Sequence, residues 1–162
     1  MAKLMMFAFP GTTLRQMYFV SQGVGYGRPN LRNDVLLVQF FLKAISLREA
    51  HVTAESYRPS GAANLSIDGA WGPTSVQYLK YFVDVWNRKD AKLGGASWST
   101  GWNDGAVDAP IKQQRVGSIH HKRFVIANLN FEYADLYGVD VHTNLFKDPL
   151  LPAELADEFF FV

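Results

Sequence analysis

The chain has 162 residues, 48% of them hydrophobic and 19% charged, which is typical of a globular protein with room for one ordinary domain and excludes wholesale disorder. The formal net charge is +1, so no overall basic field indicates binding to nucleic acid or to an anionic membrane surface. The sequence contains no cysteine, which excludes disulfides, thiolate nucleophiles and zinc sites built on cysteine.

The amino-terminal stretch is apolar but short. Its run of about seven apolar residues ends at Pro10-Gly11 without a small-residue cleavage pattern, so we interpret it as a buried part of the mature protein. No run approaches the ~20 apolar residues that span a bilayer. We therefore expect synthesis in the cytoplasm without a recognisable signal peptide. Residues 1–27 are expected to form an extension of short β or turn structure, whose alternating glycines make a turn rather than a phosphate-binding loop.

The spacing of apolar residues predicts a first helix over residues 33–46. Asn33-Asp34 is expected to cap it, and Gln39 and Lys43 are expected on its polar side. The buried stripe recurs at three- and four-residue steps, at Val35, Val38, Phe41, Leu42 and Ile45.

A turn followed by a second helix forms the most distinctive stretch of the chain. Asp68-Gly69 is a turn signal, and Pro73 suits the first position of a helix because its missing N–H has no partner there anyway. A second helix is expected over residues 73–88, with Trp71 packed where the helices meet.

The carboxyl-terminal half is expected to contain a long loop at residues 90–117 and a third helix at 118–137, capped by Ser118 and closed by Gly138. Within the loop, Asp104-Gly105-Ala106 repeats Asp68-Gly69-Ala70, and Trp98 and Trp102 either pin the loop to the core or form a binding platform.

Residues 139–162 are expected to form an interaction tail. A short amphipathic helix is predicted to begin near Pro152. The last four residues are apolar, and left in water they would expose several hundred Å² of apolar surface, on the order of 150–250 Å² for each phenylalanine. We therefore expect the tail to contact another copy of this chain or a different protein, through Phe159, Phe160, Phe161 and Val162.

Part of the chain resembles the peptidoglycan-binding-type domain. Val38-Gln39 stands where the first helix of that family has a Leu-Gln pair. Asp68-Gly69-Ala70-Trp71-Gly72-Pro73, followed by Ser75, resembles the family motif Asp-Gly-x-Phe-Gly-Pro-x-Thr. The resemblance covers roughly residues 28–88, and it departs from the family pattern where Trp71 replaces Phe and Ser75 replaces Thr.

This resemblance implies a mainly α protein with a compact three-helix core, spanning residues 28–138 here. It implies a non-catalytic module that binds cell-wall peptidoglycan, acting at the cell envelope or in a phage-related or secretion-related assembly. The ligand would bind between the first helix and the turn that follows residue 67, at Asp68, Trp71, Tyr78 and Tyr81.

No constellation for catalysis or metal binding is visible. His120 and His121 are adjacent and would point to different faces of a helix, and neither a metalloprotease motif nor a nucleophile elbow occurs. We expect no enzyme activity, no metal and no cofactor. The alternative to wall binding is a structural subunit that keeps the fold without the ligand and docks through its apolar carboxyl terminus.

Overall fold

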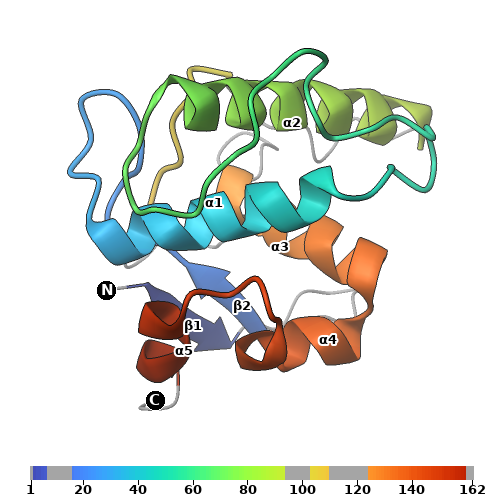
Figure 1. The fold of residues 1–162 in the computed structure, drawn as a ribbon. Helices are drawn as coiled ribbons and strands as arrows, with labels where there is room; N and C mark the ends of the chain where they lie inside the picture. The colour runs from blue at the N-terminus through green and yellow to red at the C-terminus, as the bar shows by residue number, and fades with distance from the viewer. Residues whose placement is uncertain (1, 7–15, 94–102, 110–123, 160–162) are drawn as a thin grey trace.

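The computed structural model describes residues 2–6, 16–93, 103–109 and 124–159, and within them the protein is mainly helical, as predicted (Figure 1). Among these residues no helix is long and apolar enough to cross a membrane. The elements in chain order are β1 (Lys3–Met6), β2 (Gln16–Phe19), α1 (Arg32–Ser46), α2 (Pro73–Lys92), α3 (Val125–Tyr137), α4 (Val139–Thr143), the 3-10 turn η1 (Leu145–Lys147) and α5 (Ala153–Phe159).

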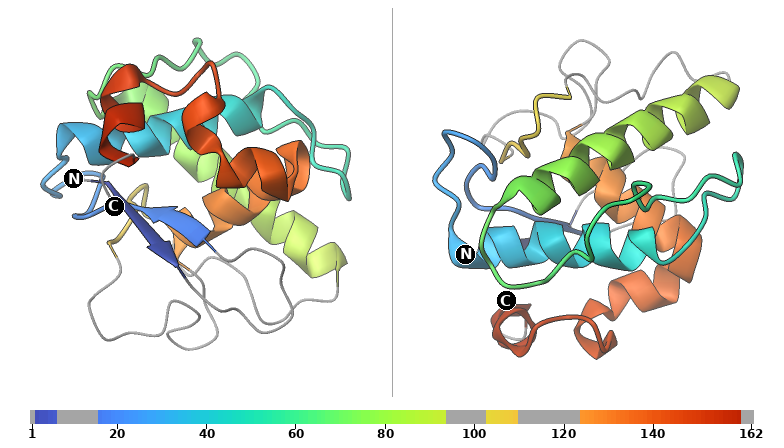
Figure 2. Two further views of the ribbon diagram at one scale, coloured as in Figure 1. Left: turned by 90° about the horizontal axis from the view of Figure 1, so that it is seen from below. Right: turned by 45° about the horizontal axis from the view of Figure 1, so that its top comes forward.

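Helix α1 lies at the centre of the fold. It packs against α2, α3 and α5, with α2 on one side and the carboxyl-terminal helices on the opposite side (Figures 1 and 2). The antiparallel pair β1–β2 pairs Lys3 with Phe19 and lies against α3 through β2. Because neighbours cover α1 all round, its predicted apolar stripe is buried, and so are side chains outside that stripe.

Two sequence-based assignments on α1 are wrong. Asn33 and Asp34 do not cap the helix, which begins after Leu31 without a side-chain cap. Instead, the buried Asp34 carboxylate accepts hydrogen bonds from the Ser21 N–H and hydroxyl, both at 2.8 Å, and from the Gln22 N–H at 2.9 Å. Gln39, expected on a polar side, is only 1% exposed, because the turn that follows residue 67 folds over it.

Helix α2 begins at Pro73, as predicted, and ends at Lys92 rather than at residue 88. Lys89 and Asp90 of this extra turn are buried despite their charges, and Lys89 forms ion pairs with Glu132 and Asp135 of α3. Helix α3 ends at Gly138, as expected, where a positive φ of 96° suits glycine and the N–H of Gly138 bonds the Ala134 carbonyl at 2.9 Å. Its predicted start at residue 118 is wrong, because the helix begins at Val125 after the extended residue Phe124; Ser118, which lies outside the described residues, therefore does not cap it.

The predicted helix after Pro152 is present as α5, but the segment from α4 to α5 packs on the protein's own core. Leu145, Leu151 and Leu155 are buried there, and Arg32 at the start of α1 forms an ion pair with Glu154 at 2.9 Å. This packing leaves a much shorter segment than residues 139–162 for contact with a partner. Of the four predicted partner-binding residues, Phe159 is the last residue of α5, and Phe160, Phe161 and Val162 lie outside the described residues.

A buried amide connects α3 to both β2 and α4. The Asn130 carbonyl oxygen Oδ1 accepts the Tyr18 N–H at 2.8 Å, and its Nδ2 donates to the Tyr18 carbonyl at 2.9 Å. The same Oδ1 lies 2.9 Å from Nε2 of His142, a fully buried side chain of α4. Since Oδ1 can only accept, Nε2 carries the imidazole proton. Burial lowers the pKa of His142 to about 4, so the ring is neutral at physiological pH.

Because His142 is buried in its neutral form, the free energy of unfolding should fall at acid pH. The unfolded chain takes up the proton near pH 6.5, before the folded chain does near pH 4, so stability is fully present above pH 6.5 and falls as the pH drops toward 4. The loss should reach about 3 kcal/mol across that window. Denaturant titrations at several pH values should show this slope in the wild type and a flatter one in His142→Gln. Equal slopes for the wild type and His142→Gln would contradict the assignment.

Candidate functional site

The predicted binding region is centred on a tight turn at residues 68–70. The Asp68 carboxylate accepts the N–H of Ala70 at 2.9 Å, and Gly69 between them has a φ of 74°, which favours glycine. Asp68 is exposed, and the turn leads directly into Trp71 and the start of α2.

The buried amide of Gln39 holds this turn from beneath. Its oxygen Oε1 accepts the N–H groups of Asp68 at 3.1 Å and Gly69 at 2.9 Å. Its Nε2 lies within hydrogen-bonding distance of Asp68 Oδ1 at 3.0 Å, the Ala70 carbonyl at 2.9 Å and Ser75 Oγ at 3.2 Å. The Gln, the Asp-Gly and the Ser of the motif therefore meet in one hydrogen-bonded cluster, called the Gln39 clamp below.

The clamp also sets the charge state of Asp68. The Ala70 N–H, and after it the Gln39 amide, lower the pKa of the Asp68 carboxyl, so the carboxylate is ionised at neutral pH. Both bonds fall on Oδ1. Within the described part of the chain, Oδ2 has no hydrogen-bond partner and is open to an incoming donor.

The gap expected between α1 and the turn contains an arginine side chain. Arg32 donates from Nη1 to the Asp68 carbonyl at 2.7 Å, and its Nε and Nη2 donate to Glu154 of α5, both at 2.9 Å. A Cβ built on Gly69 would lie 2.8 Å from Arg32 Nη1, so glycine at this position also makes room for the guanidinium. The exposed surface of the site thus lies on the outer side of the turn rather than in a groove behind it.

The aromatic residues predicted to contact the ligand lie at different depths. Trp71 is half-buried against the core, and its Nε1 is buried without a hydrogen-bond partner among the described residues. Tyr81 is also half-buried. The ligand contact predicted for Tyr78 is wrong, because Tyr78 is 2% exposed and its hydroxyl donates to the Ala63 carbonyl at 3.1 Å. Its position on the core-facing side of α2 is the reason.

The second Asp-Gly-Ala sequence folds into the same kind of turn. The N–H of Ala106 donates to Asp104 Oδ1 at 3.0 Å, and Gly105 has a φ of 78°. This turn lies against Lys80 and Val76 of α2, which lie 3.1 and 3.2 Å from a Cβ built on Gly105. The likeness seen in the sequence therefore reflects a shared local geometry, whereas Trp98 and Trp102 lie outside the described residues.

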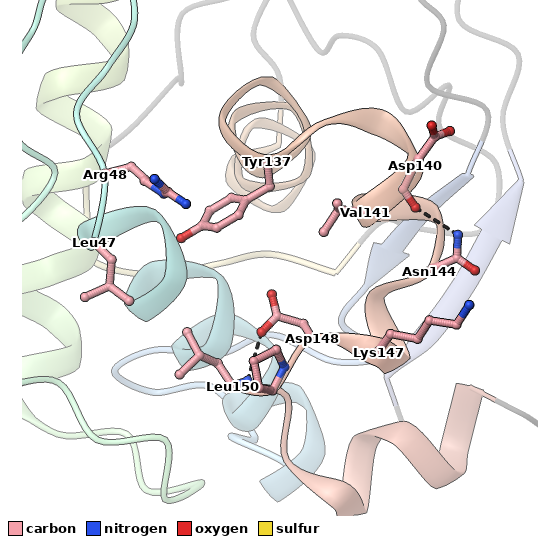
Figure 3. A pocket seen from close by; sticks show the side chains of 10 residues that line it. Leu47, Arg48, Tyr137, Asp140, Val141, Asn144, Lys147, Asp148 and Leu150 are labelled. Atoms are coloured by element: carbon pink, nitrogen blue, oxygen red, sulfur yellow. Dashed lines mark hydrogen bonds between the residues drawn. The ribbon is translucent and has the colours of Figure 1, made fainter.

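A cavity that the sequence analysis missed opens at the other end of α1 (Figure 3). It has a volume of about 740 Å³, within the range of about 300–1,000 Å³ common for ligand sites, and it is open to solvent. We call it the Tyr137 pocket. It is lined by Leu47, Arg48, Tyr137, Asp140, Val141, Asn144, Lys147, Asp148, Pro149 and Leu150.

A ring stack and a hydrogen bond hold the base of the Tyr137 pocket, and its walls combine apolar side chains with the charged groups of Arg48, Asp140, Lys147 and Asp148. The Tyr137 ring stacks on Tyr133 with centroids 4.7 Å apart, and its hydroxyl donates to the Ala44 carbonyl at 2.7 Å. The Arg48 guanidinium lies 4.9 Å from the centre of the Tyr137 ring. Leu47 is 58% exposed and Val141 42% exposed, so apolar side chains face solvent on two sides of the opening. No sequence motif marks this site, because its walls come from loops and helix ends that meet only in the fold.

The strongest buried charge cluster joins α2 to α3. Lys89 Nζ lies 2.6 Å from Glu132 Oε2 and 2.7 Å from Asp135 Oδ2. Burial alone would lower the pKa of Lys89, but attraction to Glu132 and hydrogen bonds to both carboxylates outweigh it, and the pKa is raised. The ammonium group therefore stays protonated at neutral pH, and it connects the helices rather than acting as a base or nucleophile.

Among the described residues, no group of three or more His, Asp or Glu side chains is arranged to hold a metal ion. Comparison of the chain with protein-family models, with curated proteins and with solved structures finds no match. The resemblance to the peptidoglycan-binding-type domain therefore stays a prediction from the motif residues of the sequence.

Replacing Gln39 by leucine should test the clamp. Leucine keeps most of the volume but leaves the N–H groups of Asp68 and Gly69 without their acceptor, so we expect a loss of about 2–4 kcal/mol in unfolding free energy. Gln77→Leu, the same change at an exposed position of α2, should shift stability by less than about 0.5 kcal/mol. Similar losses in the two variants, measured by denaturant titration, would mean that the clamp contributes little.

Replacing Lys89 by methionine should leave the Glu132 carboxylate buried without its cation. We expect a loss of about 3–5 kcal/mol, largely recovered in the double variant Lys89→Met with Glu132→Gln, which removes the uncompensated charge. The control Lys92→Met changes an exposed lysine on the same helix and should be nearly neutral. A double variant no more stable than the single one in calorimetry would argue against a coupled pair.

Proposed function

We propose that this protein is a non-catalytic module that binds peptidoglycan through the outer side of the turn at residues 68–71. The observation that carries the proposal is the Gln39 clamp. It joins the matched residues of the family motif and holds the turn that exposes Asp68 and leads into the half-buried Trp71.

The exposed groups at this turn suit an amide- and hydroxyl-rich polymer. Asp68 Oδ2 is an ionised acceptor that can receive hydrogen bonds from hydroxyl or amide groups. Beside it, the half-buried Trp71 offers part of an aromatic face, a surface on which sugar rings pack well. Tyr81 remains a candidate contact, whereas Tyr78 acts through the core. The corresponding place of action would be the cell envelope or a phage-like particle.

A second role, as a structural subunit that docks on other proteins, is favoured by a separate observation. The Tyr137 pocket exposes apolar side chains at the opposite end of α1 from the turn. This role and wall binding use different surfaces and can be tested separately.

Wall binding can be tested by co-sedimentation with purified peptidoglycan sacculi. We expect the folded wild-type protein to sediment with them. Asp68→Asn keeps a carbonyl oxygen for the Ala70 N–H but removes the charge at Oδ2, and it should weaken binding about tenfold, the loss of one charge-assisted hydrogen bond. Asp104→Asn makes the same change in the matching turn and should bind like the wild type. A folded wild-type protein that stays in the supernatant would overturn the proposal.

A further inference from the structure

One aromatic side chain of the described chain lies almost entirely in solvent. Tyr26 is 98% exposed, and the next most exposed large hydrophobic residue among those described, Leu93, is 63% exposed. An aromatic ring stabilises a fold through the surface that it buries, so a ring left in water contributes almost nothing. Core packing therefore does not account for a tyrosine at this position, in the loop of residues 21–31 before α1.

The loop that carries Tyr26 is held in one shape by hydrogen bonds. The side-chain oxygen of Asn30 accepts the Gly25 N–H at 2.7 Å, and its Nδ2 donates to the Gly25 carbonyl at 2.9 Å. Gly25 and Gly27, on either side of Tyr26, have φ values of 143° and 69°, so the backbone turns sharply at the tyrosine. A side chain presented on a backbone that is already ordered loses little further entropy when it binds a ligand.

The loop is also fastened to the turn at residues 104–106. Val24 and Val107 exchange two backbone hydrogen bonds, of 2.9 and 2.7 Å. A Cβ built on Gly25 would lie 2.7 Å from the Cβ of Ala106, so glycine lets the two segments approach this closely. Tyr26, the next residue, therefore has a fixed place beside that turn.

Through that turn, Tyr26 lies at the same end of the molecule as the proposed wall-binding turn. A Cβ built on Gly105 would lie 3.2 Å from Val76 in the first turn of α2, and the Val76 N–H bonds the carbonyl of Gly72, which follows Trp71. Figures 1 and 2 show the loop before α1 (blue) beside the segment that leads into α2 (green). An extended polymer bound at the wall-binding turn therefore has Tyr26 within its reach.

The charges around the two turns favour an uncharged ligand over an acidic one. The arginines nearby are already paired, each at 2.9 Å, in the ion pairs Arg28–Asp108 and Arg32–Glu154. The other exposed charges described here are one ammonium group and three carboxylates, those of Lys80, Asp68, Asp84 and Asp104. This surplus of carboxylates repels the peptides of peptidoglycan, which carry free carboxylates, whereas the hydroxyl and acetamide groups of its sugars are uncharged.

We propose that Tyr26 is a second contact residue of the wall-binding surface, and that its ring packs on a sugar of the glycan strand of peptidoglycan. The inference rests on the proposed function and names the part of the polymer that is bound. Asp68 accepts hydrogen bonds from the strand at the turn, and Tyr26 contacts a sugar farther along the same strand. The tyrosine ring supplies an apolar face, and its hydroxyl supplies a donor and an acceptor at the edge.

Co-sedimentation with purified sacculi tests the contact. Tyr26→Ala should weaken binding about three- to tenfold, the loss of one aromatic contact. Tyr26→Phe keeps the ring and should retain most of the binding, whereas Tyr26→Leu, which is apolar but not aromatic, should bind like the alanine variant. Leu93→Ala removes another exposed apolar side chain, just beyond the end of α2, and should bind like the wild type. Because Tyr26 is exposed, its variants should unfold at the wild-type temperature, which separates the contact from any effect on folding.

A second measurement identifies the part of the polymer that is bound. Glycan strands freed of their peptides by an amidase should still bind the wild type in titration calorimetry, and Tyr26→Ala should lose affinity for them by the same factor. The inference is overturned if Tyr26→Ala binds sacculi like the wild type, if leucine serves as well as phenylalanine, or if the bare strands do not bind. In each of these cases a wild type that sediments with sacculi leaves the proposed function standing, whereas a folded wild type that stays in the supernatant overturns both.

Discussion

The structure depends on one constraint: most of α1 is buried, so the polar groups buried on it must find their partners inside the protein. Asp34 satisfies this by accepting hydrogen bonds from the segment before the helix, and Gln39 does so by holding the turn before α2. Near the other end of α1, the Ala44 carbonyl accepts the hydroxyl of Tyr137. These three points fasten the amino-terminal segment, the turn and α3 to a single helix. The polar groups of this buried helix therefore help to fix where its neighbours lie, in addition to the burial of apolar surface.

Local signals in the sequence predicted the three main helices and the turn, although α2 runs to Lys92 rather than to residue 88 and α3 begins at Val125 rather than at residue 118. Pro73 and Gly138 marked the start of α2 and the end of α3, because each residue suits the backbone at that end of a helix. The geometry of Asp68-Gly69-Ala70, and its recurrence at residues 104–106, also followed from residue types alone. By contrast, Gln39 was predicted on the polar side of its helix, because a glutamine in an amphipathic pattern normally faces solvent. Only the tertiary contact with the turn makes it a core residue.

The candidate sites were harder to predict from the sequence, because they too depend on tertiary contacts. Tyr78 and Tyr81 were both predicted as ligand contacts, but Tyr78 is buried with its hydroxyl on the Ala63 carbonyl, whereas Tyr81 is half-buried. The Tyr137 pocket combines residues 47–48 with residues 137–150, and nothing local in either stretch indicates the other. The carboxyl-terminal region was expected to be an interaction tail because its apolar residues had no visible partner. Instead, Leu145, Leu151 and Leu155 are buried in the core, and α5 packs against α1, a contact between segments more than a hundred residues apart along the chain.

The bonds between Asn130 and Tyr18 have a consequence for the small sheet. In an antiparallel pair, the N–H and C=O groups of alternate residues point away from the neighbouring strand, where a further strand could add to them. On β2 the Asn130 amide occupies both groups of Tyr18, and the side chain of Gln16 reaches across to the Thr143 carbonyl. The Asn130 side chain thus makes the two hydrogen bonds that a further strand would make with Tyr18. The outer edge of β2 is closed at its middle, so the sheet is protected there against growth by edge-to-edge pairing with another polypeptide.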